Sequence, residues 1–258
     1  MSRIEKTFAA LNRPALITFI MAGDPDAATS MEVLKSLPDA GADIIELGMP
    51  FTDPMADGPT IELAGGRALK AGASMKQTLQ MVRDFRKGNT DTPIVLMGYF
   101  NPILQYGIEK FANDASDAGV DGLIIVDLPP EEADETLAAS KDKGLDIIRL
   151  ITPTTTQQRL PKILDGASGF LYYVSITGVT GAASADLSKI GPHIEEIKKE
   201  TDLPVAIGFG IKTPEDAAQF GKIGDAIVVG SSIVQTIAEK QDAAAVSEQV
   251  QALAGALK

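Results

Sequence analysis

Three carboxylates lie within one short segment, residues 46–60, which reads Glu-Leu-Gly-Met-Pro-Phe-Thr-Asp-Pro-Met-Ala-Asp-Gly-Pro-Thr. Glu46 closes an apolar run, and Asp53 and Asp57 follow it in a loop that holds several glycines and prolines. Proline fixes φ and glycine opens φ > 0, so we expect this loop to hold one backbone shape. A stiff loop that presents acids beside the end of a strand can fix the geometry of proton transfer. The segment therefore predicts general acid–base chemistry.

The residue types that the chain lacks narrow this chemistry. With no cysteine among the 258 residues, there is no thiolate nucleophile and no cysteine-based metal site. The single histidine, His193, cannot form a multi-histidine zinc site, and we expect it to be a solvated residue near the start of a helix. None of the strands predicted below contains a lysine that could form a Schiff base. Proton transfer is therefore left to carboxylates, tyrosine or lysine.

Each acid also has a structural alternative. Glu46 stands among isoleucine and leucine, where burial would raise the pKa of its carboxyl towards useful values, although a solvated acid at a strand end would fit too. We favour a catalytic Glu46 because of its position. Asp57 precedes glycine and Asp53 precedes Pro54, and both pairs also suit turns. Two further acids are expected only to cap helices or turns: Asp24, which precedes Pro25, and Asp127.

Two glycine-containing motifs suggest a phosphate site. They are Gly208-Phe-Gly210 and Gly230-Ser-Ser232, and each follows a predicted strand and precedes a predicted helix. Glycine lets backbone N–H groups approach an anion at the positive end of a helix. Gly-Phe-Gly alone could be a tight turn, but the second motif at the neighbouring strand end favours phosphate binding. Gly178 and Gly181, in the loop after the sixth strand, could complete this pocket or only provide flexibility.

A repeated sequence motif, which we call the glycine motif, indicates the elements that position these residues. Glycine, often with an acid two positions later, precedes a β-branched run, as in Gly41-Ala-Asp-Ile-Ile and Gly119-Val-Asp-Gly-Leu-Ile-Ile. Glycine suits the left-handed position after a helix, and the run after it is typical of a buried strand. Helical stretches fill most of the gaps, for example residues 74–87 and 131–143. Eight strands are predicted, at residues 15–21, 43–47, 93–97, 122–126, 146–151, 170–174, 204–207 and 226–229.

The order of these elements predicts the fold class. Strict strand–helix alternation implies a parallel sheet with right-handed crossovers. Eight units in about 250 residues fit an α/β fold of the (β/α)8 TIM-barrel type, in one domain over residues 1–258. Extra helices are expected near residues 2–12 and 242–257. An open doubly wound sheet is the alternative, although no Gly-x-Gly-x-x-Gly follows the first strand.

The charge balance and the hydropathy pattern exclude some partners. The net charge of −12 is made of interspersed acids and bases, which argues against binding a nucleic-acid backbone. No run reaches the roughly 18 apolar residues of a membrane helix, and the amino-terminal residues are mixed and polar. We therefore expect a soluble, cytoplasmic protein that binds neither nucleic acid nor a membrane.

The segment from Glu46 to Ile61 resembles the signature of the tryptophan synthase α subunit family. The resemblance spans roughly residues 3–240 and implies a lyase that cleaves indole-3-glycerol phosphate to indole and glyceraldehyde 3-phosphate, in tryptophan biosynthesis. Supporting similarities follow in family order: Phe19 with Ala22-Gly-Asp-Pro25, Met97-Gly-Tyr-Phe-Asn-Pro102, Val126-Asp-Leu-Pro129, Ser175-Ile-Thr-Gly-Val-Thr-Gly181, Gly208-Phe-Gly-Ile211 and Gly230-Ser231.

The resemblance also implies roles for individual residues. Glu46 would be the acid–base group that protonates indole C3 and assists removal of the glycerol hydroxyl proton. Asp57 would accept a hydrogen bond from the indole N–H and stabilise positive charge on the ring. The other implied roles are these: Phe19 and Met97 line the indole pocket, Tyr172 orients Glu46 or the glycerol chain, Gly181, Gly210, Gly230 and Ser231 hold the phosphate, and Thr180 contacts Asp57 when its loop closes.

A partner is implied as well. The family works with a tryptophan synthase β subunit, in an α2β2 complex, which condenses indole with serine using pyridoxal phosphate. That cofactor belongs to the partner, so this chain is expected to hold neither cofactor nor metal, and Asp53, Pro54 and Asn101 are expected to face the partner. Three alternatives stay open: a free-standing indole-3-glycerol-phosphate lyase, a barrel retained only to activate its partner, and another phosphate-binding TIM-barrel lyase or isomerase.

Overall fold

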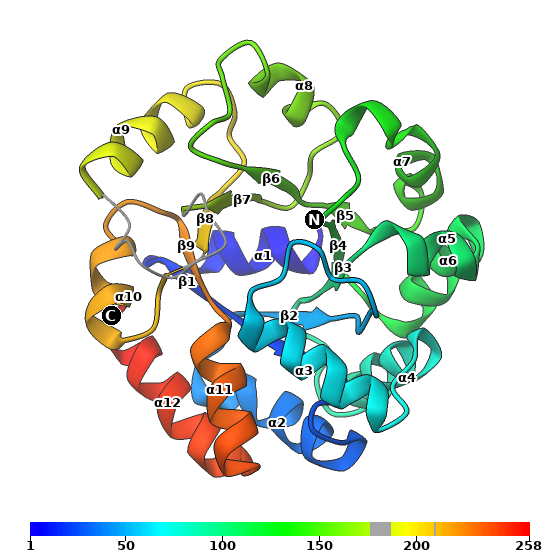
Figure 1. Ribbon diagram of the computed structural model, residues 1–258. Helices are drawn as coiled ribbons and strands as arrows, with labels where there is room; N and C mark the ends of the chain where they lie inside the picture. The colour runs from blue at the N-terminus through cyan, green and yellow to red at the C-terminus, as the bar shows by residue number, and fades with distance from the viewer. Residues whose placement is uncertain (176–186, 209) are drawn as a thin grey trace.

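Parallel strands form a ring that helices surround (Figure 1). The computed structural model describes residues 1–175, 187–208 and 210–258. Within these residues the strand order is β5-β4-β3-β2-β1-β9-β8-β7-β6, which confirms the (β/α)8 TIM-barrel class over the doubly wound alternative. The strands are β1 (Ala15–Met21), β2 (Ile44–Gly48), β3 (Ile94–Gly98), β4 (Gly122–Ile125), β5 (Asp146–Ile147), β6 (Arg149–Ile151), β7 (Leu171–Val174), β8 (Val205–Gly208) and β9 (Ala226–Val229).

The fifth predicted strand, residues 146–151, divides into two. β5 pairs with β4, whereas β6 pairs with β7. Ile148 separates them, and its N–H donates to the carbonyl of Leu123 at 3.0 Å. The described residues therefore contain nine strands where we predicted eight, because one strand divides as it closes the ring.

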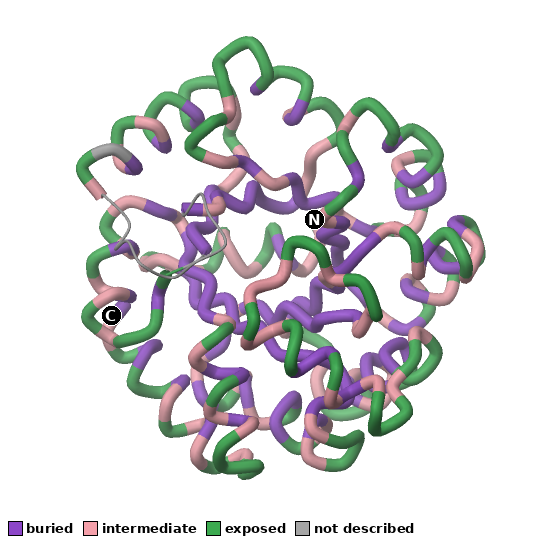
Figure 2. The backbone as a smooth tube through the Cα atoms, in the orientation of Figure 1, coloured by how far each residue is buried: buried purple, intermediate pink, exposed green. Residues whose placement is uncertain are grey.

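Side chains on the two faces of the strands enter different apolar clusters. Ile44 of β2 points into the ring and joins a cluster with Ile17 and Ile124. Ile45 points outward and belongs to the cluster beneath the helices. Successive strand residues alternate between faces, so Glu46 shares the inward face of Ile44. Figure 2 shows that the strand ring is buried, whereas the outward faces of the helices are exposed.

The helices cover the outside of the ring, with one exception. α1 crosses the amino end of the ring, where its Ile4 is fully buried in the inward cluster (Figure 1). The additions predicted at residues 2–12 and 242–257 are confirmed as α1 and α12, and α12 packs against α2. Within the described ranges, no helix combines the length and apolar character that a membrane span requires.

The helices and the 3₁₀ turn of the described residues have these bounds: α1 (Arg3–Ala10), α2 (Ala27–Ala40), α3 (Pro59–Lys70), α4 (Met75–Arg86), α5 (Phe100–Tyr106), α6 (Ile108–Ala118), η1 (Pro130–Glu132), α7 (Asp134–Lys141), α8 (Leu160–Leu164), α9 (Leu187–Ile197), α10 (Pro214–Phe220), α11 (Ser231–Lys240) and α12 (Ala243–Gly255).

Acids at the starts of strands stabilise the amino end of the ring. Asp43, Asp121 and Asp225 each accept a hydrogen bond from a backbone N–H at the start of a neighbouring strand. The donors are Leu16 (2.7 Å), Ile94 (2.8 Å) and Val205 (2.8 Å), respectively. The same carboxylates form ion pairs with Arg13, with Arg3 and Arg86, and with Lys198, respectively. The acid of the repeated glycine motif thus fixes the alignment of neighbouring strands. It does so at the amino end of the ring, opposite to the loop that follows Glu46.

Candidate active site

Glu46 is a buried acid on the inner face of the ring. It is the third residue of β2, between Phe19 of β1 and Val95 of β3 in the strand register, and its side chain is fully buried. Burial in this apolar setting raises the pKa of its carboxyl to about 8, because desolvation penalises the charged form. Neither carboxyl oxygen has a hydrogen-bond partner among the described residues. Glu46 is therefore mostly protonated at neutral pH and can donate a proton inside the barrel.

Tyr172 of β7 lies close enough to Glu46 for the two side chains to interact electrostatically. Its pKa is raised mainly by burial and further by the Glu46 carboxylate. A Cβ atom at Gly208, on the neighbouring strand β8, would overlap the Tyr172 hydroxyl and ring carbons. Gly208, which we assigned from sequence to the phosphate motif, therefore makes room for this tyrosine at the barrel interior.

Asp57 lies in the loop between β2 and α3, which crosses the near end of the ring in Figure 1. The carboxylate is half-buried, and its Oδ1 accepts a hydrogen bond of 2.7 Å from the Tyr99 hydroxyl. Burial raises the pKa of Asp57, the hydrogen bond from Tyr99 opposes this effect, and the charge of Glu62 adds to it. The structure thus places a second carboxylate in the loop that follows the strand of Glu46.

Apolar side chains flank the position of Glu46. Phe19 is 6% exposed, and a Cβ at Gly48 would lie 2.7 Å from its ring, so the ring lies over this glycine. Met97 pairs with Gly48 in the β2–β3 ladder and packs with both the inward cluster and the cluster around Phe19. An aromatic ring entering beside Glu46 would meet these two side chains.

Of the two helix ends predicted to bind an anion, that of α11 has no side-chain cap among the described residues. Gly230 is the residue before this helix. Ser231 is exposed in the first turn, and the neighbouring Ser232 hydroxyl has no partner in the described part of the chain. Free N–H groups, a serine hydroxyl and the helix dipole together suit a phosphate.

The second predicted helix end differs from expectation. The Asp216 carboxylate accepts from the backbone N–H groups of Lys212 and Thr213, and the Thr213 hydroxyl accepts from Asp216 N–H. This capping box occupies the start of α10, so the helix after Gly210 does not offer its end to an anion. Gly210 itself is exposed, with φ +84°. Thr180 and Gly181, with Gly178, lie outside the described residues.

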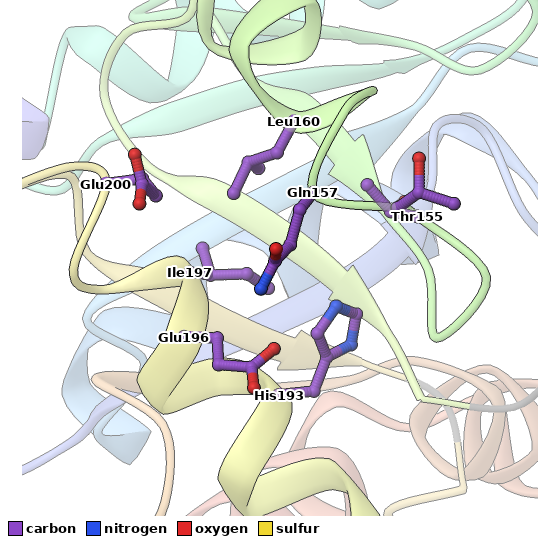
Figure 3. Close-up of a pocket in the computed structure, with 8 residues that line it drawn as sticks. Thr155, Gln157, Leu160, His193, Glu196, Ile197 and Glu200 are labelled. Atoms are coloured by element: carbon purple, nitrogen blue, oxygen red, sulfur yellow. The ribbon is translucent and has the colours of Figure 1, made fainter.

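His193 lies in the interior of α9, not at its start as predicted. Its Nδ1 is 2.9 Å from the Tyr173 hydroxyl, and the two rings meet edge to face. Figure 3 shows it beside a cavity of about 290 Å³ between α9 and the segment that includes Thr155 and Leu160. Tyr173 points to the outer face of β7, opposite to Tyr172, so His193 belongs to the outer layer.

Asp24 and Asp127, which we expected to cap helices or turns, both bind groups of the protein itself. Asp24 is buried and binds Arg67 through both carboxylate oxygens, at 2.7 and 2.8 Å. Asp127 accepts from the backbone N–H of Phe100 at the start of α5, at 2.7 Å. Across the described residues, no three His, Asp or Glu side chains are grouped to hold a metal ion.

The expected partner-facing residues lie on the surface near Asp57. Asp53 and Asn101 are exposed and Pro54 is half-buried. Sequence analysis missed Met55, which is 84% exposed in the same loop, and it gave Tyr99 no role. The signal available for Tyr99 was its position two residues after the predicted strand at residues 93–97.

Comparison with known proteins places the chain in one family. The family model for the tryptophan synthase alpha chain matches residues 6–258. Tryptophan synthase subunit alpha from Legionella pneumophila str. Paris is 40% identical, with a TM-score of 0.92, over 99% of this chain and 98% of its own. The chain belongs to the tryptophan synthase alpha chain family.

Two further solved structures are similar to this chain over its whole length. Tryptophan synthase from M. tuberculosis, in its aminoacrylate-bound form, is 34% identical over 100% of both chains, with a TM-score of 0.91. A protein from Aquifex aeolicus VF5 is 38% identical over 100% of both chains, with a TM-score of 0.93. The activity predicted from sequence is confirmed: the chain is a carbon–carbon lyase that cleaves indole-3-glycerol phosphate.

Proposed function

We propose that Glu46 carries out both proton transfers of this cleavage. The protonated carboxyl gives its proton to indole C3, which places positive charge on the indole nitrogen. The resulting carboxylate then removes the proton from the hydroxyl group on the adjacent carbon. As the carbon–carbon bond breaks, its electron pair returns to the ring, which releases indole and leaves glyceraldehyde 3-phosphate, and Glu46 is protonated again. The observation that carries this proposal is a fully buried, inward-pointing carboxyl whose pKa is about 8.

Asp57 stabilises the cationic ring in this proposal. Its carboxylate accepts a hydrogen bond from the indole N–H, which strengthens as positive charge develops. The position of Asp57 in the loop directly after β2 supports this role, because that loop lies over the strand end that carries Glu46.

The remaining residues bind and orient the substrate. Phe19 and Met97 contact the indole ring, and Tyr172 orients Glu46. The phosphate binds the first turn of α11 through Gly230 and Ser231, with Gly210 alongside. Gly181 and Thr180 would complete the pocket from their loop, with Thr180 contacting Asp57.

The chain is proposed to act as one part of a complex. Its partner is a tryptophan synthase β subunit in an α2β2 assembly, which holds the pyridoxal phosphate, so this chain uses no cofactor of its own. Asp53, Pro54 and Asn101 face that subunit, and the complex works in the cytoplasm. The exposure of Asp53 and Asn101, and the place of Asp53 and Pro54 in the loop that holds Asp57, support the arrangement.

Indole release from indole-3-glycerol phosphate tests the role of Glu46. Glu46→Gln is expected to lower kcat by at least about 100-fold, since the amide cannot give or take the proton. In the unmodified chain, kcat/KM should fall as pH rises through about 8, where the carboxyl loses its proton. Glu248→Gln, at an exposed position of α12, is the matched control. Unchanged cleavage by Glu46→Gln would overturn the assignment.

A further inference from the structure

Tyr99 joins two loops at the carboxyl end of the barrel. It directly follows β3, and its side chain is 3% exposed. Its hydroxyl donates to Asp57 Oδ1 at 2.7 Å and accepts from the backbone N–H of Ala56 at 3.0 Å. Its ring lies 5.6 Å from the ring of Phe51, at an angle of 36°. The tyrosine is therefore held by its ring and by its hydroxyl.

These contacts determine where the hydroxyl proton points. A backbone N–H only donates, so the Ala56 N–H occupies a lone pair of the Tyr99 oxygen. The single phenolic proton is then directed to Asp57. Among the described residues the hydrogen bond to Asp57 is at Oδ1, so this part of the chain leaves Oδ2 for another donor.

We propose that Tyr99 is a positioning residue for the cleavage reaction, which fixes the carboxylate of Asp57 so that one chosen oxygen faces the indole N–H. This inference rests on the role proposed above for Asp57. Tyr99 touches Asp57 and not the reacting atoms, so its contribution passes through that carboxylate.

The hydrogen bond also influences the charge of Asp57. Burial raises the pKa of this carboxyl, and the bond from Tyr99 opposes the rise because it stabilises the charged form. Without the Tyr99 hydroxyl, a larger fraction of Asp57 would be protonated at a given pH. A protonated Asp57 accepts more weakly from the indole N–H, so cleavage would need a higher pH.

Tyr99→Phe tests the proposal because it keeps the ring against Phe51 and removes only the hydroxyl. We expect kcat/KM to fall roughly tenfold, mostly in kcat, and the acidic limb of the pH profile to move up by about one pH unit. Tyr106→Phe is the matched control, since Tyr106 donates to Asp114 at 2.6 Å on the outer helices. It should leave the rate and the pH profile unchanged.

Asp57→Asn and the double variant separate the two proposals. If Asp57→Asn lowers cleavage and Tyr99→Phe adds nothing to it, Tyr99 acts through Asp57 as inferred. If Asp57→Asn lowers cleavage while Tyr99→Phe keeps the normal rate and acidic limb, the inference about Tyr99 is wrong and the role of Asp57 stands. A lower melting temperature with an unmoved pH profile would give Tyr99 a structural role only, which also overturns the inference. Normal cleavage by Asp57→Asn would overturn the role of Asp57 itself.

Discussion

The raised pKa of Glu46, which suits it to proton transfer, also makes the stability of the fold depend on pH. In the unfolded chain the carboxyl ionises near its usual value of 4.5, whereas in the fold its pKa is about 8. The folded state therefore binds more protons than the unfolded state between these two pH values. The contribution of Glu46 to stability is most favourable below pH 4.5 and declines as pH rises to about 8.

Glu46→Gln should remove this pH dependence. At pH 9 the variant is expected to be more stable than the parent by up to about 5 kcal/mol, because no charge is buried in it. At pH 4 the two proteins should differ little, since both then carry a neutral side chain. Urea unfolding at the two pH values measures the difference, and an equal gap at both would show that desolvation of Glu46 is not the cause.

Single residues also show what sequence could predict. The burial of Glu46 among apolar neighbours follows from local pattern, and the structure agrees, although Glu46 is the third residue of β2 and not its last. The contact of Tyr99 with Asp57 joins positions 42 residues apart, and no local pattern encodes it. The same holds for Gly208, because the ring that fills its missing side chain comes from another strand.

At the scale of elements, the acids that follow glycine hold neighbouring strands in register. Asp121 accepts from Ile94 N–H and binds both Arg3 and Arg86, and its side chain is 4% exposed. The glycine motif predicted the helix–strand junctions correctly. It did not predict this role of the acid, because the partners of the acid are supplied by other elements.

Asp121→Asn should destabilise the barrel by about 2 to 4 kcal/mol, since two arginines lose their buried charge partner. The control is Asp84→Asn, which removes an exposed ion pair with Lys87 on a helix surface and should change stability little. Thermal and urea unfolding measure both variants. Equal stability of the two would contradict the role given to the strand-start acids.

For the whole molecule, the exposed loop around Asp53 and Met55 is the surface to test for a partner. Asp53→Ala is expected to weaken binding to a tryptophan synthase β subunit roughly tenfold, because it removes a charge from the proposed contact. Indole release by the isolated chain should stay within about twofold of the parent, since Asp53 lies outside the proposed proton path. Calorimetric titration measures the affinity, with Glu248→Ala on α12 as the distant control. Unchanged affinity would remove Asp53 from the partner surface.

The closed ring was predictable because glycine-led apolar runs recur at regular intervals along the chain. Predicted strand ends agree with the structure to within about one residue, as for β2 and β8. The division at Ile148 was not predictable, since residues 146–151 are one continuous apolar run and only pairing with different neighbours divides it. The predicted location of His193 was wrong, because α9 begins at Leu187, six residues before it.

The helix across the amino end of the ring affects how substrate enters the barrel and how products leave it. α1 and the inward cluster fill that end, with Ile4 fully buried, so we expect substrate to reach Glu46 from the carboxyl end. On this expectation, substrate and both products pass the loop of Asp57 and the first turn of α11. A protein bound over the carboxyl end of the barrel would bind the released indole before it diffuses into the surrounding water.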